Sequence, residues 1–262
     1  AKRAVDLLLD WGFTECGFAV VHWRANVGNW ASRRVAWAGG FHFGPTIPRL
    51  LDHRGVRTDA WTGWITADDD RRPTTRWIEI PVLETGQVRL RSWRDDDAHR
   101  LVEISNDEQL RHFIPEFRVP RTVDRVPGYL TNSGVLGATG IRIAWCVADR
   151  ETDVALGSVA LFGMDGGDPT CGELGYWAHP DARSRGVVSA AVNRVVEWCF
   201  TPEDDGGFGM RRLCIMTAAS NTAARRVAES AGFRHLGSER RSLPLGDGYD
   251  DTALYDRLRD DT

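Results

Sequence analysis

Hydrophobic and polar residues alternate along the chain with two different periods, and the change of period marks the predicted elements. Val88–Trp93 alternate with a period of two, which is typical of a strand. Asp95–Ile104 begin with an acidic cluster suited to cap a helix and continue with helical spacing. A second short helix is predicted to begin at Arg121 and to end near Tyr129–Gly134, where glycine and asparagine follow.

Three further strands and a long amphipathic helix are predicted next. The strands are Arg142–Ala148, Ala155–Phe162 and Gly172–Ala178, with the turns Asp149–Asp153 and Asp165–Pro169 between them. Over Val187–Thr201 apolar residues recur every three or four positions, which predicts a helix with one buried face. These apolar residues are Val187, Val188, Ala191, Val192, Val195 and Cys199.

The last part of the pattern predicts one more strand, one more helix and a closing pair of strands. Arg212–Thr217 is a short apolar run, Asn221–Ala231 has helical spacing and ends at Gly232, and the remaining residues suffice for two antiparallel strands. The order β-α-α-β-β-β-α-β-α-β-β predicts a mixed α/β fold. Its junction at Ala178–Gly186 joins a strand to a helix N-terminus, where open sheets bind ligands.

The chain also repeats itself. Residues 29–41 align without a gap to residues 221–233, and eight of these thirteen positions are identical. The same register later matches Arg49 with Arg241 and Asp59 with Asp251. Upstream the register shifts by a five-residue loop insertion at Glu203–Gly207, and Trp11 then matches Trp198. Two generic amphipathic helices would not align their glycine and asparagine positions as well, so duplication is the better explanation.

The repeat divides the chain into unequal copies. A polar stretch broken by proline at Asp68–Thr75 predicts the connection, so we assign residues 1–69 to the first copy, 70–86 to a linker and leading strand, and 87–262 to the second. The counterpart of Ala4 lies about 100 residues into the second copy. We therefore expect that the front half of the first copy precedes Ala1 in a longer native product, or is not represented here.

Composition narrows the functional classes. The net charge of −4 without clustered cations argues against nucleic acid, and no apolar run reaches the roughly 18 residues that cross a membrane. The N-terminus has no pattern of a secretory signal, which predicts a cytoplasmic protein. Five scattered cysteines and seven histidines show no metal-ligand spacing, so neither disulfides nor a metal site is expected.

The junction carries the candidate chemistry. Amide groups at the start of a helix point one way and lack partners, and the helix dipole adds positive potential there. Arg183 and Arg185 beside Gly186 add positive charge, so the turn suits a diphosphate, although many such segments are only helix caps.

Three segments together resemble the GNAT acetyltransferases. Arg183-Ser-Arg-Gly-Val-Val188 is similar to the acetyl-CoA loop of that superfamily, and Glu173–Ala178 and Asn221–Phe233 match its flanking strand and later helix in the right order. The resemblance covers residues 87–260 and is nearest to the Rim-type branch, which acetylates N-terminal amines of ribosomal proteins and other amines. It implies a central sheet that is mostly antiparallel and flanked by helices, preceded by the C-terminal half of a second GNAT fold.

The resemblance also implies a cofactor site and a reaction. Acetyl-CoA would be bound by Trp177, Ala178, His179, Arg183, Ser184, Arg185, Gly186, Val187, Val188 and Asn221. A primary amine, either a protein N-terminus or a small molecule, would attack the thioester directly in a ternary complex. A backbone N–H near Trp177 or Ala178 would polarise the carbonyl.

Two residues are candidates for catalysis. Glu173 is the candidate base that deprotonates the amine, and Tyr176 could border that amine. Either residue could instead be structural, since Glu173 could be an exposed strand carboxylate and Tyr176 a packing residue. Asn221 is expected to cap its helix as well as to hold the cofactor.

Several positions depart from the family pattern. Ala228 and Ala224 occupy positions where relatives have a tyrosine or serine that protonates the leaving thiolate, whereas the first copy keeps Ser32. Val188 replaces a small residue, which predicts weakened cofactor binding.

These departures leave two functions open. One is an acetyltransferase whose amine enters beside Asn106–Pro120, with Glu108 and Glu116 as an acidic rim, and the other is an acetyl-CoA sensor or scaffold with weak or lost catalysis. The resemblance also leaves a homodimer open.

Overall fold

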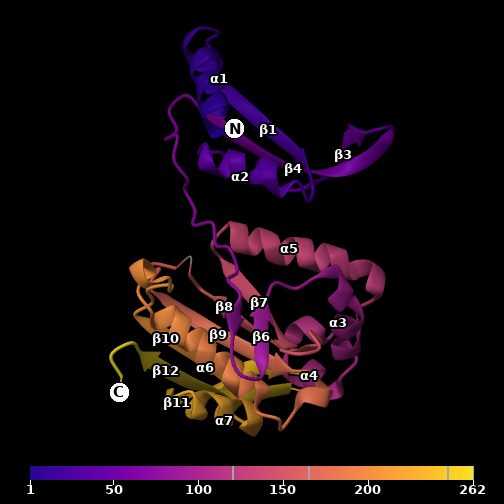
Figure 1. The fold of residues 1–262 in the computed structure, drawn as a ribbon, viewed down its shortest axis with the longest axis vertical. Helices are drawn as coiled ribbons and strands as arrows, with labels where there is room; N and C mark the ends of the chain where they lie inside the picture. Colours follow the sequence, from indigo (N-terminus) through magenta and orange to yellow (C-terminus); the bar gives the residue numbers. More distant parts are fainter. Residues whose placement is uncertain (120, 165, 247, 262) are drawn as a thin grey trace. The chain divides into compact units, whose positions relative to one another are not determined.

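A computed structural model describes residues 1–119, 121–164, 166–246 and 248–261. The chain divides into two compact units, Ala1–Arg76 and Trp77–Thr262 (Figure 1). The predicted turn at Asp165–Pro169 and the predicted acceptor segment Asn106–Pro120 each include one position outside the described residues.

The first unit contains two helices and a small antiparallel sheet. Its elements are α1 (Lys2–Thr14), β1 (Val20–Asn26), α2 (Trp30–Ala38), β2 (His42–Phe43), β3 (Ile47–His53) and β4 (Val56–Thr66). Strand β4 pairs with β1, β2 and β3. Leu9, Ala36, Phe41 and Ile65 form the buried centre between the helices and this sheet.

An eight-stranded sheet forms the middle of the second unit. Its order is β11-β12-β10-β9-β8-β7-β6-β5, and all neighbours are antiparallel except β9 and β10. The strands are β5 (Leu83–Glu84), β6 (Val88–Arg91), β7 (Arg142–Asp149), β8 (Ala155–Phe162), β9 (Cys171–Ala178), β10 (Arg212–Ala218), β11 (Arg234–Leu245) and β12 (Gly248–Leu258). The predicted mixed α/β fold with a mostly antiparallel sheet is confirmed.

Helices cover both faces of this sheet (Figure 1). The α-helices are α3 (Ala98–Ser105), α4 (Glu108–Phe113), α5 (Val126–Ala138), α6 (Val187–Phe200) and α7 (Thr222–Ser230). Leu174 of β9 joins the core beneath α6 and α7, whereas Trp177 packs against residues of α3, α4 and α5. Residues three apart on a strand point to opposite faces, so the two groups of helices lie on opposite sides.

The predicted end of the second short helix was wrong. A 3₁₀ turn at Val123–Arg125 leads into α5, which continues past Tyr129–Gly134 to Ala138. Glycine lowers helix propensity, but packing against a sheet outweighs it. At Gly137 an added Cβ would lie 3.6 Å from Ile143 of β7, an ordinary contact distance, so the helix packs directly against the strand there.

A buried ion pair connects β6 to the start of α3. The Arg91 guanidinium donates to both carboxylate oxygens of Asp97, at 2.8 and 3.0 Å, and to Asp153 at 2.9 Å. The side chains of Arg91 and Asp97 are only 4% and 7% exposed. These hydrogen bonds raise the pKa of Arg91. The bidentate geometry fixes the exit of the chain from the sheet.

Replacing Arg91 should therefore destabilise the second unit strongly. Arg91→Met leaves the Asp97 carboxylate buried without its cation, and such a change costs about 3–5 kcal/mol of unfolding free energy. Urea unfolding would measure the loss. Arg91→Met combined with Asp97→Leu should recover much of it, since no charge is then left unpaired; equal stability of the single and double variants would contradict this account.

Candidate functional site

Strands β9 and β10 diverge in the middle of the sheet. Their parallel pairing is limited to three positions and ends where Glu173 faces Cys214. Beyond that point β10 continues to pair with β12 as far as Ala218, and β9 continues to pair with β8 as far as Ala178. In the described residues a gap therefore opens between Leu174–Ala178 on one side and Ile215–Ala218 on the other.

The register of β8 and β9 decides which amides face this gap. The His179 N–H donates to the Leu156 carbonyl at 2.8 Å, which fixes a hydrogen-bonded pair at the end of the ladder. N–H groups of consecutive strand residues point to alternate sides. The Trp177 N–H therefore points to β8, and the Ala178 N–H points into the gap.

The turn after β9 has the backbone shape of an anion site. Ser184 and Gly186 both adopt left-handed conformations, with φ of 59° and 73°. Gly186 precedes α6 without a side-chain cap, and the first helical bond runs from the Ala190 N–H to the Gly186 carbonyl. The N–H groups of Val187, Val188 and Ser189 thus lie ahead of the helical bonding pattern at the positive end of the helix.

Val188 does not crowd this turn. Its side chain is 7% exposed and belongs to the core beneath α6. A Cβ added to Gly157 on β8 would lie 3.4 Å from the Val188 Cγ2 atom, so the missing side chain there leaves room for valine. The side chain thus points away from the open amides, and the argument for weakened cofactor binding does not hold.

The two arginines of the turn differ in their surroundings. Arg183 donates to the Asp107 carboxylate, which also caps α4 by accepting from the Leu110 N–H at 2.8 Å. Burial raises the pKa of Asp107, but the hydrogen bonds from Arg183 and Leu110 outweigh it, and the net shift is downward. Arg185 donates to the Asp181 carbonyl at 3.4 Å, and its charge adds to the hydrogen bonds that chiefly lower the pKa values of Asp149 and Asp181.

His179 is buried and holds the start of the turn. Its Nδ1 accepts from the Asp181 N–H at 3.2 Å, and its Nε2 lies 3.1 Å from the Glu103 carboxylate. Burial is the largest cause of the lowered pKa of this imidazole. A neutral ring with its proton on Nε2 satisfies both contacts, so the imidazole connects β9 to α3.

These contacts reveal residues that the sequence did not indicate. Glu103 and Arg100 of α3 contact His179 and Asp181, and Asp107 contacts Arg183. Three contacts thus attach the turn to one short helical region. The residues lie more than 70 positions before the turn, so no spacing rule could have identified them.

Glu173 lies at the point where the two strands separate. It is half-buried, and burial raises the pKa of its carboxyl above the ordinary 4.5. Two positions further, the Phe162 ring occupies the space beside Gly175. A Cβ added to this glycine would lie only 2.6 Å from the ring. Glu173, Gly175 and Trp177 alternate onto the face opposite α6.

Tyr176 and Asn221 meet around the first turn of α7. The Tyr176 hydroxyl donates to the Ala224 carbonyl at 2.7 Å, and burial raises the pKa of this phenol. The Asn221 side chain accepts from the Ala224 N–H at 3.1 Å, which confirms that it caps the helix. Ala228 is fully buried in the core.

Of the two acidic residues in the predicted rim, Glu116 is paired with arginine. Glu116 lies 2.8 Å from the Arg142 guanidinium and 4.0 Å from that of Arg121. Arg118 donates to the Pro244 carbonyl at the end of β11 at 2.7 Å. The segment is not an open loop, because α4 and a 3₁₀ turn at Pro115–Phe117 occupy most of it.

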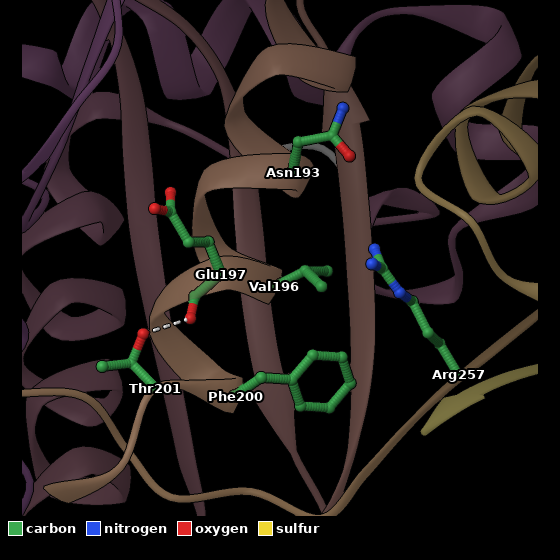
Figure 2. A pocket seen from close by; sticks show the side chains of 6 residues that line it. All are labelled: Asn193, Val196, Glu197, Phe200, Thr201 and Arg257. Atoms are coloured by element: carbon green, nitrogen blue, oxygen red, sulfur yellow. Dashed lines mark hydrogen bonds between the residues drawn. The ribbon is translucent and has the colours of Figure 1, made fainter. Parts of the chain in front are cut away.

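An open pocket of about 390 Å³ lies elsewhere. Figure 2 shows that it is lined by Asn193, Val196, Glu197 and Phe200 of α6, by Thr201 directly after this helix, and by Arg257 of β12. These residues occupy the C-terminal half of α6, so most of the pocket lies roughly 10–20 Å along the helix from Gly186. None of them belongs to the predicted cofactor set.

Two further searches of the described residues gave negative results. No group of three or more histidine, cysteine or acidic side chains there could hold a metal ion. In the same residues, no helix combines the length and apolar character that a membrane span requires.

Comparisons with known proteins agree with this geometry. The family model of the acetyltransferase (GNAT) domain matches residues 87–234. No match was found among curated proteins. Solved structures do match, and the similarity extends over about two thirds of the chain.

Three of these structures show the sequence identity, structural similarity and coverage of such matches. A GNAT-family acetyltransferase from Bacillus anthracis is 19% identical with a TM-score of 0.58, covering 69% of this chain and 100% of its own. The ribosomal L7/L12 alpha-N-protein acetyltransferase RimL, in complex with coenzyme A, is 15% identical with a TM-score of 0.60, covering 68% and 98%. RimJ from Mycobacterium smegmatis, in complex with CoA-disulfide, is 21% identical with a TM-score of 0.59, covering 70% and 88%.

At these identities the solved structures establish the fold, while the family model matches more than half of the chain. The chain therefore belongs to the GNAT acetyltransferases, enzymes that use acetyl-CoA as the acetyl donor.

Proposed function

We propose that the second unit transfers the acetyl group of acetyl-CoA directly to a primary amine, on a protein N-terminus or a small molecule, in a ternary complex. The observation that carries this proposal is the coincidence of two features at the end of β9. One is the gap between β9 and β10, and the other is the set of open amides at the start of α6. The thioester of acetyl-CoA would fit the gap, and the diphosphate of the same molecule would fit the open amides.

In this proposal the turn binds the diphosphate. The amides of Val187, Val188 and Ser189 donate to phosphate oxygens, and the left-handed residues Ser184 and Gly186 shape the concave backbone. Arg185 is exposed and adds positive charge, and Arg183 does the same if it leaves Asp107. His179 acts as a positioning residue that connects the turn to Glu103.

The thioester lies in the gap, and Ala178 polarises it. Its N–H points between the strands and is available to an oxygen there, whereas the Trp177 N–H faces β8. A fixed amide dipole stabilises the negative charge that develops on the carbonyl oxygen in the transition state. Trp177 contributes by packing against Phe117 and Trp93 on the other face. Asn221 would hold the amide arm of the cofactor from the α7 side.

Glu173 removes the proton from the attacking amine, directly or through a water. Its raised pKa makes it a better proton acceptor than an ordinary carboxylate, because it holds a proton more tightly. It also lies at the base of the gap. Tyr176 forms the floor on the α7 side, where its hydroxyl is already bound to Ala224.

The released thiolate is protonated from solvent. Ala224 and Ala228 offer no acidic proton, and the Tyr176 hydroxyl is occupied. A thiolate is a stable leaving group, so this departure lowers the rate without preventing the reaction.

A second candidate function is an acetyl-CoA sensor with little turnover. The absence of a donor at Ala224 and Ala228 favours it, and so does the pairing of Arg183 with Asp107. A thermal-shift measurement with acetyl-CoA, followed by an assay of thiol release over a panel of amines, separates the two functions. Binding without turnover for any amine would support the sensor.

We further propose that residues 1–69 are the C-terminal half of a second GNAT-like domain, with residues 70–86 as linker and leading strand and 87–262 as the complete domain. Shared backbone details support this. Arg49 and Arg241 both have a positive φ, of 53° and 49°, and both donate from the backbone N–H to an aspartate ten residues later. Asn29 caps α2 as Asn221 caps α7.

Replacing Glu173 tests the base. Glu173→Gln keeps the shape but removes the proton acceptor, so kcat should fall by roughly 10²–10⁴-fold. In the parent protein kcat/KM should rise with pH through the raised pKa of Glu173, and the variant should lack this limb. Unchanged binding of acetyl-CoA by calorimetry is the control. A variant with the parent pH profile would exclude Glu173 as the base.

Replacing Asp107 tests the role of Arg183. Asp107→Asn retains a helix cap but removes the carboxylate that competes with the diphosphate, so the Kd for acetyl-CoA should fall about fivefold, or ~1 kcal/mol. Asp181→Asn is the control, because it removes a neighbouring charge that lies beside Arg100 and His179 instead of Arg183. If both changes alter the Kd equally, the effect is a general one of removing negative charge. That result would contradict the idea that Arg183 leaves Asp107 to bind the diphosphate.

A further inference from the structure

The first helix presents an apolar stripe to solvent. Ala4, Leu8 and Trp11 lie one above another on α1, at positions i, i+4 and i+7. Leu8 is 65% and Trp11 56% exposed, and Ala4 is exposed too. Another side of the helix, carrying Leu9 with Val5 and Phe13, packs into the first unit's own core. The exposed stripe is thus a second face of α1, separate from the one that packs.

The aligned positions of helix α6 form a corresponding stripe, and there it is buried. The repeat aligns Ala4, Leu8 and Trp11 with Ala191, Val195 and Trp198, which are 0%, 0% and 8% exposed. They are covered by the sheet, since α6 packs on β5 to β9, and Trp198 contacts Trp145 of β7 with ring centroids 5.5 Å apart. The front half of the fold therefore covers this stripe, and at Trp198 the Phe208 ring, 4.8 Å away between centroids, covers it as well.

The neighbouring strands differ in the same way. Strand β10 pairs with β12 on one side and with β9 on the other, whereas β1 pairs with β4 alone among the described residues. Next to this edge, Phe18 is exposed, and its aligned residue Met210 is fully buried. A Cβ added to Gly172 of β9 would lie 3.1 Å from the Met210 methyl group, so β9 is what covers that position.

We propose that the α1 stripe and the open edge of β1 form a docking surface for an antiparallel sheet of the kind formed by β6–β9, with its last strand parallel to β1. The occupant is a GNAT front half that is joined in the longer native chain to the N-terminal end of α1. In the second unit the covering strands directly precede α6 and reach it through residues 179–186. The inference rests on the proposed common origin of the two units.

Leu7 provides a matched control within the same helix. It is 62% exposed, almost as much as Leu8, but its aligned residue is Arg194, which is not part of the core. A sheet docked as on α6 would bury Leu8 and leave Leu7 near solvent. Substitutions of the two leucines therefore distinguish a specific docking contact from a general effect of surface hydrophobicity.

The test uses the native gene product with its own upstream residues beside the 262-residue chain. In the native product the amides of β1 should exchange with deuterium at least 100-fold more slowly than in the 262-residue chain. Leu8→Glu should abolish this protection, and Leu7→Glu should leave it within twofold. Acetyl transfer by the second unit should be the same in both variants, so a failure of the docking surface is distinguished from a failure of the proposed reaction.

Three outcomes would overturn the proposal. One is equal exchange of β1 in the two chains, and another is an equal effect of the two glutamate substitutions. The third is a dimer of the 262-residue chain, seen by light scattering, that Leu8→Glu dissociates and Leu7→Glu does not; the stripe would then bind a second copy.

Discussion

The separation of β9 from β10 is the constraint on which the rest of the second unit depends. The pairing ends at Glu173 and Cys214 because each strand follows its other neighbour, β8 or β12, whose antiparallel ladder continues. Backbone groups inside a sheet are costly to leave unpaired, so such a gap persists only where flanking ladders hold the strands and a ligand can use the free groups. The half-buried carboxylate, the inward amide of Ala178 and the helix start after β9 all owe their positions to it.

A second constraint acts on the turn itself. A concave turn with left-handed residues at Ser184 and Gly186 is unstable unless its surroundings hold it. Here His179 and Asp181 are tied to α3, and Arg183 is tied to the residue that caps α4. The same short region also approaches β11 through Arg118. In the proposed function, a phosphate bound at the turn would act on these contacts, which extend to the segment proposed for the acceptor.

The parts of the fold that could be predicted from sequence are those in which a local pattern decides the structure. The nearly continuous apolar run of Arg142–Ala148 and the apolar stripe of α6 were sufficient, because burial alone fixes such elements. The end of α5 was not predictable, since contact with β7 outweighs three internal glycines. For the candidate site, the sequence indicated the turn but not Glu103 or Asp107, because their proximity arises only when α3 and α4 fold over β9. The orientation of Val188 likewise depends on a glycine thirty-one positions away on another strand.

Under the proposed common origin, the two units also separate what the back half of this fold can do alone from what it needs the front half to provide. Both have the capped helix, the strained arginine and the aspartate that binds it, so these features require no front half. The gap next to β10 is different, because it exists only between two strands. In the first unit Ser32 is the residue aligned with Ala224, and its hydroxyl accepts from the Trp23 indole at 3.0 Å. A hydroxyl is therefore kept in the unit whose described residues form no gap beside β1, and is missing in the unit where β9 and β10 separate, as expected from the proposed divergence of two copies.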